Sequence, residues 1–128
     1  MGYLLLIIDD SETIRSSLED ILKEGGHEVA IAQDGLDGIK KLEQLAKGGR
    51  KPHMIITDIN MAVMNGIVFI RETKKMPQFN DVPILVMTTE SERDKKMEGK
   101  AAGAVGWLVK PFNSEQILDV VEKIMSRR

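Results

Sequence analysis

Five polar residues of this sequence follow directly after short apolar segments, and their side chains could do chemistry together. Asp9 and Asp10 form one acidic pair, and Asp58 stands after a separate apolar segment. Thr88 and Lys110 follow two more such segments. A carboxylate can act as a covalent nucleophile toward a phosphoryl group, and positioned cations and donors stabilise the oxygens of that group during transfer. These residue types therefore suit phosphoryl transfer if the fold brings them together.

The three aspartates also predict a metal ion. Carboxylates held close together repel one another, and ionising all of them is unfavourable without a compensating charge. Hard oxygen ligands favour Mg²⁺, for which Mn²⁺ can substitute. Even with Lys110 nearby, one divalent cation is needed to neutralise the site. Asp9, Asp10 and Asp58 are therefore predicted metal ligands. Asp58 is the predicted nucleophile because its strand lies centrally among those that carry the five residues.

Two kinds of segment alternate along the chain. Short apolar segments predict strands at residues 3–8, 28–32, 54–57, 84–87 and 105–109. Longer amphipathic or charged segments predict helices between Ser11 and Gly25, between Asp34 and Gly48, over 66–76, over 91–102, and from 113 or 114 to 124. Ser11, Asp34 and Asn113 are predicted N-caps, and Pro77 is predicted to end the third helix. Gln116 is placed to complete a capping box with Asn113.

Alternating strands and helices indicate an α/β fold: a doubly wound, five-stranded parallel sheet with five helices on its two faces. Such sheets form their sites beyond the carboxyl ends of the strands, where the strand order reverses. In the flavodoxin-like order 2-1-3-4-5, the first and third strands are neighbours at that point. This order would bring Asp9 and Asp10 to Asp58.

The composition limits the class of protein. With 128 residues, 42% of them hydrophobic and 30% charged, the chain suits one globular domain over residues 1–128. The net charge of −2 gives no reason to expect a nucleic acid as partner. The lack of cysteine excludes disulfides and permits a reducing compartment. Because the apolar segment 3–8 is far too short to span a membrane, we expect a cytoplasmic protein with no membrane partner.

A series of motifs resembles the receiver domain of bacterial two-component response regulators, over essentially the whole chain. The motifs are, in order, Ile8-Asp9-Asp10-Ser11, Thr57-Asp58-Ile59-Asn60-Met61, Asn65-Gly66, Thr88-Thr89-Glu90, Ala102-Gly103-Ala104 and Val109-Lys110-Pro111-Phe112. The resemblance implies that Asp58 accepts a phosphoryl group from a phosphohistidine on a sensor histidine kinase. It also implies that Asp10, Asp58 and the backbone carbonyl of Asn60 bind Mg²⁺, with Asp9 acting through water. Asn60 and Glu90 match positions that tune hydrolysis of the aspartyl phosphate.

The resemblance assigns further roles around the phosphoryl group. Thr88 and Lys110 would hold its oxygens. Trp107 matches a switch aromatic that rotates inward when Thr88 moves, although plain packing of a partly exposed ring is the simpler interpretation. The Lys110–Pro111 peptide bond matches one that is commonly cis in the family. Ala62 departs from the usual proline and would loosen its loop without touching the chemistry.

The segment from Gly99 to Phe112 resembles stand-alone chemotaxis regulators of the CheY type. Because no segment remains after the fifth helix for an output domain, output is expected through docking on another protein. The implied partners are the chemotaxis histidine kinase, the flagellar motor switch and a dedicated phosphatase. We expect a monomer that assists its own phosphorylation and dephosphorylation and is not otherwise an enzyme.

Other interpretations remain open. The protein could instead be a phosphorelay intermediate, a small phosphatase with an aspartyl-phosphate intermediate, or a flavin carrier. The phosphatase would need an Asp-x-Asp pattern, and the flavin carrier a phosphate loop rich in serine and threonine after the first strand. Asp9 and Asp10 could simply cap the first helix, and His27 and His53 are expected at the surface or at a strand edge.

The fourth predicted helix is the most polar. Between Ser91 and Ala102 the one large apolar side chain is Met97, and Gly99 lies inside the helix, where glycine costs about 1 kcal/mol relative to alanine. We hypothesise that this helix is the least stable and that phosphorylation changes its docking through Thr88 and Trp107.

Overall fold

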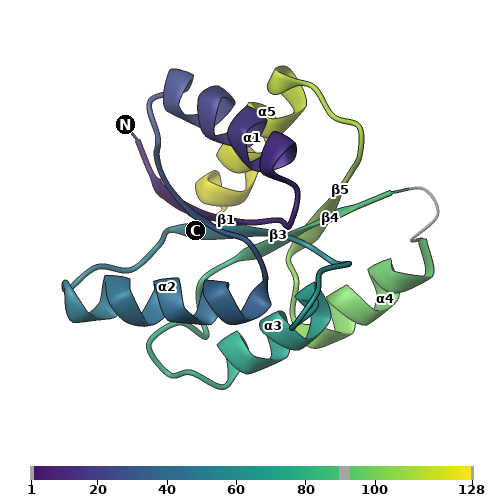
Figure 1. The fold of residues 1–128 in the computed structure, drawn as a ribbon. Coiled ribbons are helices and arrows are strands. Elements are labelled where there is room, and N and C mark those ends of the chain that lie inside the picture. The colour runs from purple at the N-terminus through teal and green to yellow at the C-terminus, as the bar shows by residue number, and fades with distance from the viewer. Residues whose placement is uncertain (1, 90–92, 128) are drawn as a thin grey trace.

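The structure is a computed structural model that describes residues 2–89 and 93–127. Within them, five strands alternate with five helices (Figure 1). The strands are β1 (Leu4–Ile8), β2 (Glu28–Ala32), β3 (Met54–Asp58), β4 (Ile84–Thr88) and β5 (Gly106–Val109). The helices are α1 (Glu12–Glu24), α2 (Gly35–Lys47), α3 (Gly66–Lys74), α4 (Arg93–Ala102) and α5 (Ser114–Ser126). Each predicted element is present, and apart from the start of α4 its boundaries lie within two residues of the expected ones.

The strands form one parallel sheet in the predicted order β2-β1-β3-β4-β5. Ile8 at the end of β1 pairs with Ala32 of β2 on one side and with Thr57 of β3 on the other. Asp58 pairs with Met87 of β4. The carboxyl ends of β1, β3 and β4 therefore lie side by side, at the point where the strand order reverses.

Helices cover both faces of this sheet. Figure 1 shows α1 and α5 on one face and α2, α3 and α4 on the other. Successive β1 residues point to opposite faces, so Leu5 and Ile7 pack beneath α1 and α5, whereas Leu6 and Ile8 pack beneath α2 and α3. Every residue of β1, β3 and β4 is buried, which explains their nearly continuous apolar sequences. Among the described helices, none is long and apolar enough to cross a bilayer.

Side-chain caps set where the helices begin. Ser11 caps α1 and Asp34 caps α2, each by accepting a hydrogen bond from the backbone N–H three residues later. Asn113 and Gln116 form the predicted capping box at the start of α5, with both hydrogen bonds at 2.8 Å. Asn65, which was not predicted as a cap, does the same for α3. These local hydrogen bonds satisfy backbone donors that the helix itself leaves unpaired.

The predicted end of α3 was wrong by two residues, because the helix ends at Lys74 and not at Met76. The N–H groups of Lys75 and Met76 donate to carbonyls three residues back, so the final turn is tighter than an α-helix. Pro77 disfavours helical backbone at Met76, the residue before it. The α-helix therefore ends before Met76, the last residue that the sequence pattern assigned to it.

The fourth helix approaches the core through a glycine. Met97 is 71% exposed, so it does not anchor α4. Gly99 is buried, and a Cβ atom there would lie 3.6 Å from Ile67 of α3 and 3.6 Å from Val86 of β4, at ordinary packing distance. There is therefore room for a methyl group at position 99, where α4 packs against the core. The predicted start at Ser91 lies outside the described residues.

We expect Gly99→Ala to stabilise the protein by about 1 kcal/mol, because alanine favours the helix and adds core contacts. Urea denaturation would measure the gain, and hydrogen exchange would show slower opening of α4. Gly103→Ala is the matched control and should destabilise the protein, since Gly103 has a φ of 119° and a Cβ there would crowd Lys74.

Hydrogen exchange of the wild type tests the hypothesis that α4 is the least stable helix. Protection of α4 equal to that of α1 would contradict it.

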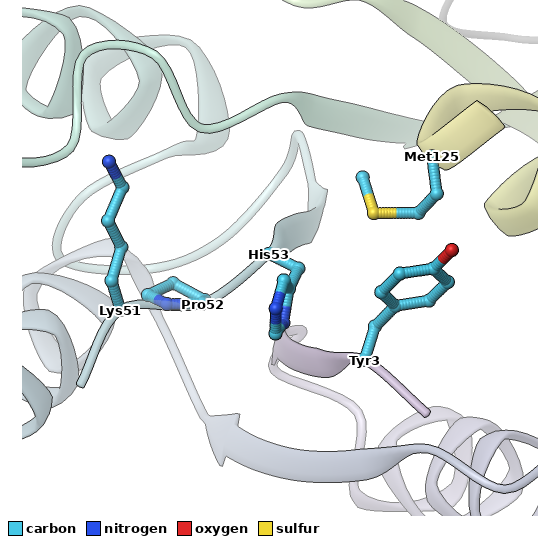
Figure 2. Close-up of a pocket in the computed structure, with 5 residues that line it drawn as sticks. All are labelled: Tyr3, Lys51, Pro52, His53 and Met125. Atoms are coloured by element: carbon cyan, nitrogen blue, oxygen red, sulfur yellow. The ribbon is translucent and has the colours of Figure 1, made fainter. Parts of the chain in front are cut away.

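Two histidines close the amino end of the sheet, far from Asp58. The Nδ1 atom of His27 accepts a hydrogen bond from Tyr3 N–H at 3.0 Å, and that of His53 accepts one from Leu4 N–H at 2.9 Å. The Tyr3 ring stacks on His27 and lies edge-on to His53. Figure 2 shows Tyr3 and His53 beside a cavity of about 390 Å³, which has no part of the acidic cluster in its lining. His53 is exposed as expected, but His27 is buried.

The buried histidine makes stability depend on pH. Burial lowers the pKa of His27, although Glu122 opposes the effect. At acidic pH the unfolded chain therefore binds more protons at this residue than the folded one does. The stability that neutral His27 gives the fold is full above its ordinary pKa of about 6.5 and is lost as the pH falls below that value. His27→Asn can keep an acceptor for Tyr3 but cannot titrate. Between about pH 7.5 and pH 5.5, urea midpoints should fall more for the wild type than for His27→Asn; equal falls would contradict this.

Candidate functional site

The carboxyl edge of the sheet gathers five polar residues from four strand ends. Asp9 and Asp10 follow β1, Asp58 ends β3, Thr88 ends β4 and Lys110 follows β5. One carboxylate oxygen from each of the three aspartates lies within 4.8 Å of the other two. The topology therefore creates the acidic cluster, because the parallel strands of this sheet end side by side at one edge.

Asp9 is fully buried, and hydrogen bonds hold both its backbone N–H and its carboxylate. Its backbone N–H donates to Ala32 O at 3.2 Å, which continues the β1–β2 ladder by one residue. Its Oδ1 accepts from Ser11 N–H at 2.9 Å, and its Oδ2 accepts from Lys110 Nζ at 3.0 Å. The cap of α1 is the hydroxyl of Ser11 and not either aspartate. Helix capping alone thus does not explain the acidic pair.

Asp58 is a buried carboxylate whose charge is only partly compensated. Its side chain is almost entirely buried. Its Oδ1 accepts a hydrogen bond from Ile59 N–H at 2.9 Å, and Lys110 Nζ lies 3.3 Å from the same oxygen. Burial and the carboxylate of Asp9 raise the pKa of Asp58 to about 6 against the opposing effect of Lys110. Burial also acts to lower the pKa of Lys110, but its two carboxylate partners raise it above the usual value.

These residues fit a divalent cation such as Mg²⁺ or Mn²⁺. Burial and the neighbouring carboxylate of Asp9 raise the pKa of Asp58, and a cation would offset both by stabilising the ionised form. Asp10 is exposed, so the cluster opens to solvent, which suits an ion that keeps several waters in its coordination shell. Asn60 is exposed in the loop after β3, and metal binding by its backbone carbonyl stays a prediction.

Thr88 presents an unsatisfied hydroxyl beside this cluster. The residue is fully buried, and its Oγ1 has no hydrogen-bond partner within the described part of the chain. A buried hydroxyl without a partner costs about 1–3 kcal/mol of stability. The residues just after Thr89, whose backbone N–H groups a capping hydroxyl at Thr88 would contact, lie outside the described residues. An oxygen-rich ligand in the site would supply the missing partner.

The loop over residues 59–65, which begins one residue later than the predicted loop, lies tightly against the end of β3. Glycine is required at position 66, because a Cβ there would collide with the carbonyl of Asp58. Although alanine replaces the proline expected at Ala62, the backbone of this loop is held by hydrogen bonds from Met64 N–H to Ala62 O at 2.8 Å and from Gly66 N–H to the carbonyl of residue 59 at 2.8 Å.

The remaining predicted residues lie around the site. The Lys110–Pro111 peptide bond is cis, the isomer that the resemblance implied. Trp107 lies on β5, paired with Val86 of β4, and is 41% exposed. This exposure suits both a static surface ring and one that rotates inward, so the switching role stays a prediction. Glu90 lies outside the described residues.

One residue at the site was not predicted from the sequence. Arg15 lies on α1, and its Nη1 donates to the backbone carbonyl of Asp9 at 2.8 Å. A basic residue at this spacing usually indicates only a solvated helix face. One signal could have identified Arg15 from the sequence: long helical side chains lean toward the helix N-terminus, which here faces the acidic pair.

Removing the charge of Asp58 should stabilise the protein in the absence of divalent cations. Its folded-state pKa of about 6 lies above the unfolded value of about 3.9, so ionised Asp58 destabilises the fold increasingly as the pH rises from 4 to 6. In EDTA near neutral pH, Asp58→Asn should gain about 1–3 kcal/mol of unfolding free energy, and the gain should shrink toward pH 4. Urea denaturation measures it, with exposed Asp20→Asn as control. A loss of stability would contradict the prediction.

Comparisons with known proteins agree with this geometry. The family described as the response regulator receiver domain matches residues 5–122. The chemotaxis protein CheY of Pseudomonas aeruginosa is 32% identical over 123 residues, which are 96% of this chain and 96% of that protein. The sensor histidine kinase CheAY of Helicobacter pylori is 33% identical over 121 residues, which are 94% of this chain but only 15% of that kinase.

A solved structure is similar in both sequence and shape. The chemotaxis response regulator CheY4 of Vibrio cholerae is 39% identical and has a TM-score of 0.86, with 97% of this chain and 99% of that one covered. The chain spans half the length or less of CheAY and of several other curated relatives. Since the family match extends over nearly all five strand–helix units, the chain belongs to the response regulator receiver domain family.

Proposed function

We propose that this protein is a signalling switch in which Asp58 accepts a phosphoryl group from a phosphohistidine of a sensor histidine kinase. The observation that carries the proposal is the setting of the Asp58 carboxylate, buried beside Asp9 and Lys110. The raised pKa of Asp58 and the unpartnered hydroxyl of Thr88 among the described residues both cost stability. Groups kept at such a cost are typical of a site that awaits a ligand.

The cluster would bind one Mg²⁺ ion, or Mn²⁺ in its place. Asp10, Asp58 and the backbone carbonyl of Asn60 would be direct ligands, and Asp9 would act through a water molecule. When bound, the ion supplies positive charge that offsets both the carboxylates and the oxygens of an incoming phosphoryl group.

The proposed reaction forms an O–P bond to Asp58 and breaks the N–P bond of the phosphohistidine. Ile59 N–H and Lys110 both contact Oδ1 of Asp58, so Oδ2 is the oxygen that would attack phosphorus. The imidazole leaves with the electron pair of the broken bond. Lys110 and the Thr88 hydroxyl would then donate hydrogen bonds to the phosphoryl oxygens, and Lys110 would exchange a carboxylate contact for a phosphoryl one.

Output would pass from Thr88 to a surface formed by β5 and α4. Trp107, Val105 and Met97 expose large apolar side chains there. Thr88 pairs with Val109, two residues from Trp107 on the same strand. When Thr88 moves toward the phosphoryl group, Trp107 would turn inward and α4 would change its docking. A target protein would then read the altered apolar surface.

The similarity to CheY and CheY4, both named as chemotaxis proteins, supports a stand-alone role in chemotaxis. The partners would be a chemotaxis histidine kinase, the flagellar motor switch and a phosphatase, in the cytoplasm, with the protein acting as a monomer. Asn60 and Glu90 would tune how fast the aspartyl phosphate is hydrolysed. Phosphorylation-dependent binding to a flagellar switch peptide would favour this role, whereas transfer of the phosphoryl group to another histidine would indicate a relay intermediate.

Incubation with acetyl phosphate and Mg²⁺ tests the proposal. Intact-mass spectrometry should show a labile phosphoryl adduct, and the fluorescence of Trp107 should change in intensity as the adduct forms. Asp58→Asn and addition of EDTA should each abolish the adduct, whereas Asp20→Asn, at an exposed position of α1, should leave it unchanged. A protein that stays unmodified under these conditions, while folded by circular dichroism, would refute the switch.

A further inference from the structure

Arg15 contacts the peptide unit that joins two of the predicted metal ligands. Its Nη1 donates to the carbonyl oxygen of Asp9 at 2.8 Å. This oxygen belongs to the peptide bond between Asp9 and Asp10, and the six atoms of a peptide unit lie close to one plane. A hydrogen bond that fixes the oxygen therefore fixes the plane, and with it the direction in which the chain continues to Asp10.

The two aspartates are held in different ways. The carboxylate of Asp9 is anchored by Ser11 N–H and by Lys110 Nζ. Asp10 is exposed, and within the described part of the chain no hydrogen bond or ion pair anchors its side chain. The direction of the Asp10 carboxylate therefore depends on the backbone of the turn between β1 and α1.

Arg15 is well placed to hold that turn. It lies at the fourth position of α1, where its own backbone N–H donates to Ser11 O at 3.0 Å, so the helix fixes its origin. The side chain leans back over the first turn toward the strand end, and its head is half-buried. A hydrogen bond from a guanidinium is charge-assisted and is stronger than one between neutral groups.

We propose that Arg15 is a positioning residue that aims the Asp10 carboxylate at the divalent cation through the Asp9–Asp10 peptide. The assignment rests on the proposed function, because it requires the cation site. Mg²⁺ demands near-ideal octahedral geometry, so a ligand that points in the wrong direction is lost rather than accommodated. Groups that orient metal ligands from behind change metal affinity by about 10- to 100-fold when they are removed.

Calorimetric titration of the unphosphorylated protein with Mg²⁺ tests the assignment. Arg15→Gln should bind Mg²⁺ about tenfold more weakly than the wild type. Arg15→Lys keeps the charge and one possible donor, so it should recover part of the loss. Arg71→Gln, at an exposed position of α3, removes an equal charge far from the turn and should bind as the wild type does. Circular dichroism in EDTA confirms that each variant is folded.

The outcomes separate positioning from a merely structural role. If Arg15→Gln loses stability in EDTA but binds Mg²⁺ with wild-type affinity, the residue supports the helix and the assignment is overturned. If Arg15→Gln does not fold, Arg15→Lys carries the test, and wild-type affinity in that variant overturns the assignment. If the wild type itself does not bind Mg²⁺, the proposed function fails together with the assignment.

Discussion

Repulsion between three carboxylates at one edge of the sheet is the constraint on which the rest of the structure depends. The fold answers it with the ammonium of Lys110, which contacts both Asp9 and Asp58. The compensation is incomplete, because the pKa of Asp58 remains raised. The fully buried strands β1, β3 and β4 supply the stability that this edge lacks. A rigid core therefore holds a site whose negative charge is only partly compensated, as the proposed binding of a cation and a phosphoryl group requires.

The architecture was predictable because each element carries its own local signal. Ser11, Asp34 and Asn113 each place a side-chain acceptor where a helix must begin, and these caps depend on residues only three positions apart. The convergence of the aspartates followed from strand order, which alternating elements restrict to a few possibilities. The end of α3 was the exception, because Pro77 acts on the backbone before it and not only on its own position.

Contacts between distant residues could not be predicted in this way. His27 is buried because its ring accepts a backbone hydrogen bond from Tyr3, a donor whose direction is set only when β1 and β2 pair. Arg15 looks like a solvated charge in the sequence, and its role depends on a carbonyl that the turn after β1 presents. The unpartnered hydroxyl of Thr88 is visible only when its described neighbours are in place. The sequence predicted which residues carry the chemistry, and the structure shows which contacts hold these residues and which hydroxyl is left without a described partner.

The ion pair between Lys110 and Asp9 joins residues that are 101 positions apart. One partner follows the first strand of the chain, and the other follows the last strand of the sheet. A copy of the protein whose last strand has not joined the sheet keeps all three aspartates but lacks the ammonium that compensates them. The charge balance of the acidic cluster thus depends on complete folding, because the compensating ammonium arrives only with the last strand.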